Sequence, residues 1–384
     1  MKSRLTKKQL VNLALLVFIC AAWFAIGWIL RGKTWQSNAE ITLIEQVRYQ
    51  LLNEHPGPIP GSRELTYAAI RGMLRQTDDP YAALLEPQIA AHFADDFAGR
   101  SGVVGLTFEP RNGQMVISRV NAAGPAEQAG LQAGDVILSV DGYAIDEETT
   151  STEVGLLLRG PAGEVAHFVV QRGEAILDFG PIRQPRTIVS SEMLPGEIAY
   201  LAQTAFTVNS VDLMKAALQE LLAQNPKGLI WDLRANGGGS MQSTQAILSD
   251  FIPEGLLFSA EQKDGQQKRF EAQGNALAPD LPLVVLIDQA TYSAGETAAA
   301  AIQENQRGIL IGAATYGKGV ILTTVPLPEG CLLQMTIAKW LSPTGEWYEG
   351  RGVSPDIAAS DDETTAQDEV LQRAIDYLQQ QAAR

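Results

Sequence analysis

An uninterrupted apolar run in the second half of the sequence constrains the fold more than any other feature. Residues 281–288 read LPLVVLID, with apolar side chains at consecutive positions rather than in alternation. A strand with this pattern is buried on both faces, as in a parallel sheet covered by helices. A similar run, GLIWDLR at 228–234, and segments with helical spacing alternate with it from about residue 183. The second half is therefore predicted to be an α/β domain with crossover connections.

A short loop of small and polar residues follows the strand at 281–288. It reads ATYSAGE and leads into an alanine-rich helix. Open α/β sheets place their sites at such strand-to-helix connections. Ser293, in this loop, would have the helix amides and the positive end of the helix dipole beside its hydroxyl. The alternative interpretation is that Ser293 only caps the helix.

Lys318 is a candidate base for Ser293. It lies between two glycines in ATYGKG at 314–319, and we expect it in the middle of an apolar strand. Burial lowers the pKa of an amine toward the range where it acts as a base. Such a lysine can take the proton of a serine hydroxyl, and the chain has only three histidines, none of them near either motif. We therefore predict a Ser-Lys catalytic dyad; the alternative is a lysine on an edge strand that reaches solvent.

The loop ANGGGS, which follows the strand at 228–234, offers backbone amides at the same sheet edge. Amides of this kind suit an oxyanion hole. The loop lacks the G-x-G-x-x-G spacing and a P-loop lysine, which argues against nucleotide binding. The net charge of −15 argues against nucleic acid as a partner. The histidines and the two cysteines have no metal-ligand spacing, so we expect neither a metal nor another cofactor.

The N-terminus has the pattern of a membrane anchor. Residues 11–30 are apolar except for Asn12, and a helix of this length spans about 30 Å. Four basic residues precede the segment and two follow it, which favours an N-terminus inside and a body outside. The bulky residues late in the segment argue against cleavage, although a cleaved signal peptide is the alternative. We expect a single-pass protein of the cell membrane with an extracytoplasmic body.

Between the anchor and the α/β half, the residue pattern that indicates secondary structure changes twice. Helical spacing at 39–54 and 62–76 gives way to short strands and glycine turns. The helix at 39–54 is available for pairing with a second copy, which would make a homo-oligomer. The predicted domains are a cytoplasmic tail with a signal anchor (1–34), a helical region (35–100), a small strand-rich domain (101–182) and the α/β domain (183–384).

Several motifs together resemble the carboxyl-terminal processing, or tail-specific, Ser-Lys peptidases. The segments that carry the likeness follow the family's order: Asp79-Pro80-Tyr81, GPAEQAGLQAGDVILSVDG at 124–142, DLRANGG at 232–238, SAGE at 293–296, ATYGKG at 314–319 and GRGVSPDI at 350–357. The likeness covers almost all of the chain after the anchor. It implies a crotonase/ClpP-like α/β protease core with an inserted PDZ domain at 101–182.

The resemblance also implies roles for individual residues. Ser293 would be the nucleophile and Lys318 the general base, with the amides of Gly238 and Ala294 as the oxyanion hole. The PDZ loop at Val103, Val104 and Gly105 would bind the carboxylate of a substrate's tail, next to a pocket for its last apolar side chain. Substrates would be proteins or peptides with exposed apolar C-termini.

One position departs from the family's pattern. The family usually has a glutamine four residues after the lysine, thought to orient it, and this chain has Leu322. Glu296, one helical turn after Ser293, is a candidate for the orienting role, or else a solvated helix residue. Leu322 motivates an alternative function, a PDZ scaffold that binds tails with a weakly active or inactive protease domain. Crotonase-like acyl chemistry is a third alternative, disfavoured by the inserted PDZ domain.

Overall fold

A computed structural model describes residues 39–384, apart from 275, 362–364, 366 and 383–384. The chain forms two compact units: the first ends at Gln76 and the second begins at Thr77. The predicted anchor at 11–30 lies outside the described residues. Within the described ranges, no helix is both long enough and apolar enough to cross a membrane.

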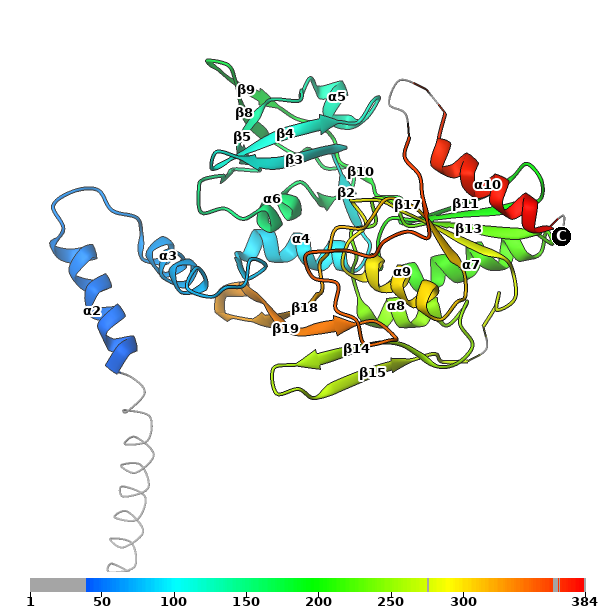
Figure 1. Ribbon diagram of the computed structural model, residues 1–384. Coiled ribbons are helices and arrows are strands. Elements are labelled where there is room, and N and C mark those ends of the chain that lie inside the picture. Colours follow the sequence, from blue (N-terminus) through cyan, green and yellow to red (C-terminus); the bar gives the residue numbers. More distant parts are fainter. Residues whose placement is uncertain (1–38, 275, 362–364, 366, 383–384) are drawn as a thin grey trace, which may run out of the picture. The chain divides into compact units, whose positions relative to one another are not determined.

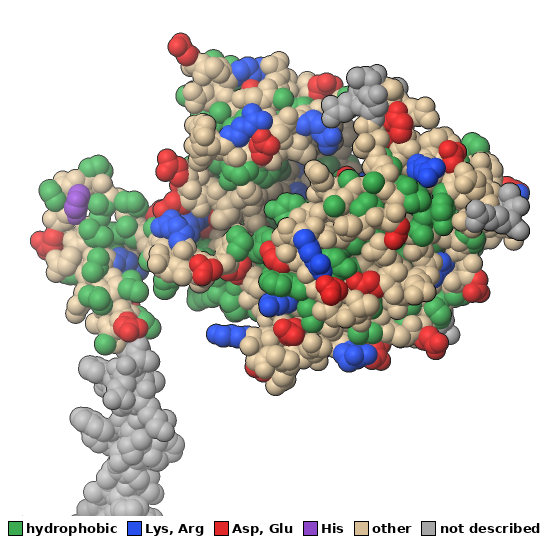
Figure 2. All heavy atoms as spheres, in the orientation of Figure 1, with side chains coloured by type: hydrophobic (Ala, Val, Ile, Leu, Met, Phe, Trp, Pro, Cys, Tyr) green, Lys and Arg blue, Asp and Glu red, His purple; other side chains and the backbone are tan. Residues whose placement is uncertain are grey.

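The first unit contains the two helices that the sequence predicts after the anchor, α2 (Ala39–Glu54) and α3 (Ser62–Leu74). Arg48 of α2 donates hydrogen bonds to the hydroxyls of Ser62 and Thr66. Helix α2 buries none of its own residues. Its exposed apolar side chains are Ile41, Leu43, Ile44, Val47, Tyr49 and Leu52. Figure 2 shows apolar side chains gathered over the surface of this unit.

The main sheet of the second unit has six strands in the order β11-β12-β13-β16-β17-β20. Its strands are β11 (Val189–Leu194), β12 (Ile198–Gln203), β13 (Gly228–Asp232), β16 (Leu283–Ile287), β17 (Ile309–Gly312) and β20 (Ile357–Ala358). Strands β12 to β20 are parallel, and β11 is antiparallel to β12. Every residue of β13 and β16 is buried, which confirms the prediction of doubly covered parallel strands.

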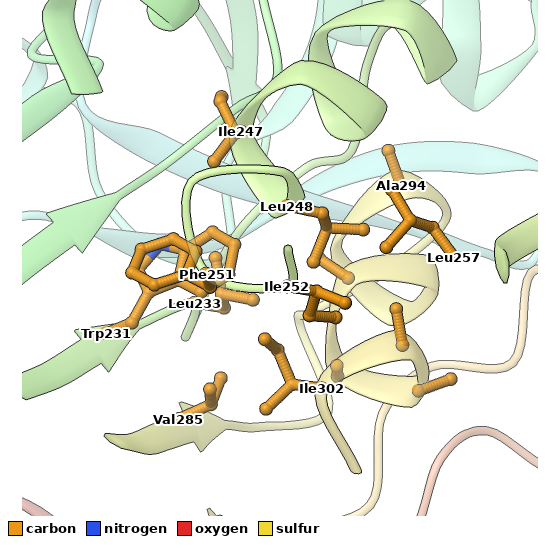
Figure 3. Close-up of a cluster of buried hydrophobic side chains, with 14 of the residues drawn as sticks. Trp231, Leu233, Ile247, Leu248, Phe251, Ile252, Leu257, Val285, Ala294 and Ile302 are labelled. Carbon is orange, nitrogen blue, oxygen red and sulfur yellow. The ribbon is translucent and has the colours of Figure 1, made fainter. Parts of the chain in front are cut away.

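Helices cover both faces of this sheet (Figure 1). They are α7 (Ser210–Leu222), α8 (Met241–Leu248), α9 (Ala294–Glu304) and α10 (Glu369–Ala382). Trp231, Leu233 and Val285 point from the sheet into a core shared with α7, α8 and α9 (Figure 3). The alternate residues Ile230 and Val284 pack against α10 on the other face. The α/β layer architecture is therefore as predicted.

A second sheet joins strands from late in the sequence to the first strand of the unit. Its strands are β1 (Ala83–Leu85), β14 (Leu256–Gln262), β15 (Gln267–Glu271), β18 (Val320–Pro326) and β19 (Leu332–Leu341). Strand β19 is central and pairs antiparallel with β1, β14 and β18. A short 3-10 turn, η1 (Pro328–Gly330), joins β18 to β19. Lys318 precedes β18, so the expectation that it lies within a strand is wrong.

The small strand-rich region forms its own sheet (Figure 1). Its buried cluster also includes residues of β1 and of the helix α4 (Pro87–Phe97). Its sheet consists of β3 (Leu106–Arg111), β4 (Gln114–Val120), β5 (Val136–Val140), β8 (Phe168–Arg172) and β9 (Ala175–Phe179), with β6 (Tyr143–Ala144) beside β5. Helices α5 (Pro125–Ala129) and α6 (Ser151–Leu157) complete it. The flanking elements are α4 (Pro87–Phe97), β2 (Ser101–Val103), β7 (Gly160–Pro161) and β10 (Gln184–Pro185). The domain boundaries given above stay predictions.

Candidate active site

Three loops meet at the carboxyl edge of the main sheet, where β13, β16 and β17 end next to one another. The hydroxyl of Thr291 donates to the carbonyl of Leu233 at 2.7 Å. The amide of Tyr292 donates to the carbonyl of Asn236, and the amide of Tyr316 to the carbonyl of Thr291, both at 3.0 Å. These bonds join the loop of Gly238, the loop of Ser293 and the loop of Lys318 into one site.

A salt-bridge network fixes the first of these loops. Asp232, at the end of β13, accepts hydrogen bonds from Arg234 and from the hydroxyl of Tyr200. Arg234 also donates to both carboxylate oxygens of Asp368, just before α10. These carboxylates hold the pKa of the Arg234 guanidinium above its usual value, although burial opposes them. The network therefore fixes the segment Asp232-Leu233-Arg234, and with it the start of the glycine loop that follows in the sequence.

Ser293 occupies a strained turn between strand and helix. Its backbone has φ 58° and ψ −119°, a region that residues with a side chain rarely adopt. Ser293 is the N-cap of α9 and forms a capping box with Glu296, but its dihedrals are not the extended ones that an N-cap residue usually has. Strained strand-to-helix turns of this kind expose a serine hydroxyl in other hydrolases. The next residue, Ala294, is fully buried beside Leu248 and Leu257, which fixes the turn against the core (Figure 3).

Glu296 links the serine loop to the lysine loop through its carboxylate. Its Oε2 atom accepts the amide of Ser293 and the amide of Lys318, both at 2.8 Å. Its Oε1 atom accepts the amide of Gly317 and the hydroxyl of Thr315, both at 2.6 Å. One buried side chain therefore sets the spacing of the two backbones.

The interpretation of Glu296 as a solvated helix residue is wrong, because its side chain is fully buried. Burial raises the pKa of its carboxyl, while the hydrogen bonds that it accepts act in the opposite direction. The bonds go to backbone amides and a hydroxyl. Within the described residues, none goes to the ammonium of Lys318, so Glu296 holds the lysine by its backbone and acts on the side-chain nitrogen only through its charge.

The side chain of Lys318 is partly buried among aromatic rings. Its Nζ atom lies 4.5 Å from the ring centroid of Tyr81 and 5.8 Å from that of Tyr292. Burial lowers the pKa of Lys318, against the smaller opposing effects of Glu349, Asp79 and Glu296. In the part of the chain that the structure describes, Nζ makes no hydrogen bond or ion pair, with the Ser293 hydroxyl or with any other group. The lysine therefore does not extend freely into solvent.

The two predicted oxyanion donors differ in their present partners. The amide of Gly238 donates to Oδ1 of Asn236 at 2.9 Å. Asn236 is fully buried, and its Nδ2 atom donates to the carbonyl of Gln203 at 2.8 Å. The amide of Ala294 has no acceptor among the described residues. A Cβ added at Gly238 would lie 3.1 Å from the nitrogen of Ala294, so the two donors are neighbours.

The predicted tail-binding residues lie at the start of the small strand-rich domain. Val103 ends β2, and Val104 is buried with its carbonyl accepting the amide of Ala126 at 2.9 Å. Gly105 has a φ of 77° and precedes β3. Strand β3 is at the edge of its sheet, and in the described structure it pairs with β4 alone. Its outer edge is therefore available to an added strand.

Sequence reasoning missed two contributors to the site, Tyr81 and Glu349. They are 268 positions apart, yet the Tyr81 hydroxyl donates to Oε1 of Glu349 at 3.3 Å. From the sequence, the motif Asp79-Pro80-Tyr81 served only as part of the family resemblance, before the PDZ domain in the chain, and was given no role in the active site. Its likeness to the family's DPY motif was the signal that could have placed it beside the lysine.

Known protein families match both the α/β domain and the small strand-rich domain. Residues 197–359 match Peptidase family S41, and residues 116–172 match the PDZ domain. A carboxyl-terminal-processing protease from Synechocystis is 34% identical over 334 residues, covering 83% of this chain and 78% of the relative. A chloroplastic C-terminal processing peptidase from Tetradesmus obliquus is 32% identical over 77% of this chain and 68% of its own length.

A solved structure shares the fold. The photosystem II D1 C-terminal processing protease superposes with a TM-score of 0.61 and 31% sequence identity. The match covers 85% of this chain and 89% of that protein. The α/β protease fold with a PDZ domain, expected from the motifs, is therefore confirmed.

Proposed function

The chain belongs to peptidase family S41, among the carboxyl-terminal processing proteases, and on this basis we propose that it cleaves extracytoplasmic proteins near their C-termini with a Ser293–Lys318 dyad. As a member of this family it is a serine-type hydrolase. The carboxylate of Glu296 carries the proposal, because one of its oxygens accepts the amides of both Ser293 and Lys318. A strained serine turn and a lysine of lowered pKa are thereby held in one site.

The chemistry begins with Lys318 in its neutral form. The amine takes the proton of the Ser293 hydroxyl as Oγ attacks the scissile carbonyl carbon. The resulting ammonium gives this proton to the leaving nitrogen, the C–N bond breaks, and an ester remains on Ser293. A water molecule then attacks the ester, with Lys318 taking a proton from the water and returning it to Oγ. The lowered pKa supports the first step, because it increases the neutral fraction near pH 7.

The amides of Ala294 and Gly238 stabilise the negative oxygen of the tetrahedral intermediate. The amide of Ala294 belongs to the first turn of α9, where the helix dipole favours negative charge. The amide of Gly238 exchanges its bond to Asn236 for a bond to the substrate oxygen. This exchange couples full assembly of the site to the arrival of substrate.

The PDZ domain captures the substrate's C-terminal tail. An extended tail adds to the outer edge of β3, and its carboxylate meets the backbone of Val103, Val104 and Gly105. The positive φ of Gly105 supports this role, because it turns the backbone just before β3. Protein and peptide substrates fit a protease domain joined to a PDZ domain.

The N-terminal segment at 11–30 anchors the protein in the cell membrane, with the catalytic body outside the cytoplasm. Its apolar length and flanking charges support this placement. The exposed apolar face of α2 supports pairing with a second copy. Membrane extraction at alkaline pH and protease accessibility in spheroplasts test the anchor. A protein released by alkaline carbonate, or one protected from external protease, contradicts it.

Cleavage is tested with full-length protein in detergent and an unstructured substrate that ends in an apolar tail. We expect new termini near the substrate's C-terminus, and none with Ser293→Ala or Lys318→Ala. Activity in either variant contradicts the dyad. Stable tail binding without new termini favours the alternative function, a tail-binding scaffold.

A further inference from the structure

In the described structure, the ammonium of Lys318 has no hydrogen-bond acceptor or carboxylate holding it. Within the described residues it makes no hydrogen bond and no ion pair, and position 322, where the family usually has an orienting glutamine, is Leu322. A lysine side chain has four rotatable carbons in its stem and loses considerable entropy when it is fixed. A base for Ser293 must nevertheless be held within reach of the hydroxyl.

The ring of Tyr81 lies next to the side-chain nitrogen of Lys318. Lys318 Nζ lies 4.5 Å from its centroid, well inside the range of about 6 Å in which cations and aromatic faces attract one another. The ring of Tyr292 flanks the same nitrogen at 5.8 Å. The ammonium is therefore held against aromatic faces rather than by a hydrogen-bond acceptor.

Tyr81 is fixed from two directions. Its hydroxyl donates to Oε1 of Glu349, whose Oε2 accepts the amide of Gly319 at 2.6 Å. The same carboxylate thus holds the ring and the backbone next to Lys318. Burial and Glu349 raise the pKa of Tyr81, so the hydroxyl stays protonated and remains a donor.

The backbone of Tyr81 is tied to the strand that faces Leu322. Asp79 accepts the amide of Tyr81 at 3.0 Å and the amide of Thr336 at 2.8 Å. Thr336, on β19, is the register partner of Leu322 on β18. The Asp79-Pro80-Tyr81 segment is therefore fastened directly across from the position at which the family has its glutamine.

We propose that Tyr81 is the positioning residue of Lys318 and that the face of its ring replaces the glutamine side chain absent at position 322. The inference rests on the proposed function, because it assigns a partner to the base of the dyad. It also gives the Asp79-Pro80-Tyr81 motif a role at the active site.

The ring acts on one protonation state of the lysine. An aromatic face attracts the ammonium and has little attraction for the neutral amine. It therefore stabilises the charge that forms when Lys318 takes the proton of Ser293. The other groups facing the nitrogen are Glu349, Asp79 and Glu296, which also favour the ammonium, while burial favours the neutral amine.

The test changes the charge distribution of the ring while keeping its shape. Residue 81 of the full-length protein is replaced by phenylalanine and, in a second variant, by trifluorophenylalanine, whose fluorines withdraw charge from the ring face. The kcat and kcat/KM for the tailed substrate are measured across pH. Ser293→Ala and Lys318→Ala are measured alongside.

We expect Tyr81→Phe to retain the ring's effect, with kcat within about threefold of wild type. Trifluorophenylalanine is expected to lower kcat about tenfold. In the pH profile of kcat/KM, the midpoint of the limb that reports deprotonation of Lys318 should shift to lower pH by about one unit. The shift is downward because a weaker ring no longer favours the ammonium. Fluorination of Phe270, which lies 4.9 Å below Lys268 on β15, is the matched control and leaves the limb in place.

A purely structural Tyr81 gives a different result, because packing does not respond to ring charge. An unchanged limb with trifluorophenylalanine at position 81 overturns the inference. If Lys318→Ala is inactive in the same series, the dyad stands and only the role of Tyr81 falls. If Lys318→Ala is active, the proposed function fails first.

Discussion

A Cβ atom added at Gly238 would lie 2.8 Å from the Cβ of Ser293, closer than two such carbons approach in proteins. The same atom would lie 2.9 Å from the carbonyl oxygen of Tyr292. Gly238 also has a φ of 75°, which strains any residue with a side chain. The glycine loop therefore packs so closely against the serine turn that no side chain fits at Gly238.

This contact predicts that Gly238→Ala inactivates the enzyme. Alanine keeps the backbone amide, but the clash must move it. Removal of one oxyanion donor costs about 100- to 1,000-fold in kcat, so we expect a loss of this order from the misplaced donor, and displacement of Ser293 adds to it. The strained backbone should also lower the free energy of unfolding by about 1–3 kcal/mol. Gly237→Ala is the matched control, because the atoms nearest to its new Cβ belong to the Tyr292 side chain, the first at 3.3 Å, and its φ is not positive. Equal activity losses in the two variants contradict the account.

Glu296→Gln should disrupt the hydrogen bonds that link the serine loop to the lysine loop. The carboxylate accepts four hydrogen bonds, and an amide has only one oxygen, so at least one buried donor loses its acceptor and faces an NH2 group. We expect a loss of about 3 kcal/mol in the free energy of unfolding and at least a hundredfold loss in kcat.

Glu304→Gln, on the same helix, is the control for Glu296→Gln. Its carboxylate accepts bonds from Thr344 and Tyr348 at a partly exposed position at the last residue of α9, the end of the helix opposite Ser293. Unfolding in urea and cleavage assays on both variants should separate them. A Glu296→Gln enzyme with wild-type kcat shows that the carboxylate does not set the active geometry.

Much of this arrangement follows from sequence pattern. The apolar runs at 228–234 and 281–288 predict buried parallel strands, and parallel strands bring their following loops to one edge. The serine loop and the glycine loop were therefore expected together. Pattern alone did not give the conformation of the loops, so the bond from Gly238 to Asn236 was not foreseen.

The position of Tyr81 could not be predicted for a different reason. It depends on the antiparallel pairing of β1 with β19, two strands that are remote in the chain. A short strand such as β1 has no periodicity that specifies its partner. The sequence left Glu296 open between an orienting residue and a solvated helix residue, because a carboxylate at the start of a helix is most often solvated. Both positions depend on tertiary contacts rather than on local structure.

Lys318 should make the stability of the protein depend on pH in a defined direction. Its pKa is lowered by burial in the folded protein, so the unfolded chain binds the extra proton at higher pH than the folded one. Between the two pKa values the free energy of unfolding rises with pH, and this stability is lost as the pH falls through the folded pKa. Lys318→Met lacks the effect.

The measurement is urea unfolding of both proteins from pH 7 to about pH 11, around the usual lysine pKa of about 10.4. Relative to wild type, Lys318→Met should gain stability as the pH falls, by about 1.4 kcal/mol for each unit by which the pKa is lowered. A difference in stability that stays constant with pH excludes a perturbed Lys318.

The PDZ domain offers a matched pair of glycines for testing tail capture. Gly105 has a φ of 77° before β3, and Gly113 has a φ of 79° in the turn after it. An alanine at either position costs about 1 kcal/mol of backbone strain, and neither new Cβ meets another atom closer than 3.5 Å. Only Gly105 lies at the proposed carboxylate site.

We expect Gly105→Ala to weaken binding of a peptide with a free apolar C-terminus about tenfold, while Gly113→Ala leaves binding unchanged. Fluorescence anisotropy with the free peptide and its C-terminal amide measures this directly. Gly105→Ala should raise KM for a tailed substrate more than it lowers kcat. Equal binding of the carboxylate and amide peptides argues against capture of the tail at this loop.

The central claim is that Lys318 activates the hydroxyl of Ser293. A fluorophosphonate probe reacts with such a hydroxyl and leaves a stable adduct, which intact mass and peptide mapping locate. The account predicts one adduct per chain on Ser293 at pH 8, none in Ser293→Ala, and labelling slowed at least a hundredfold in Lys318→Ala. Absence of labelling at Ser293 in the folded wild-type protein, or equal labelling without Lys318, would contradict it.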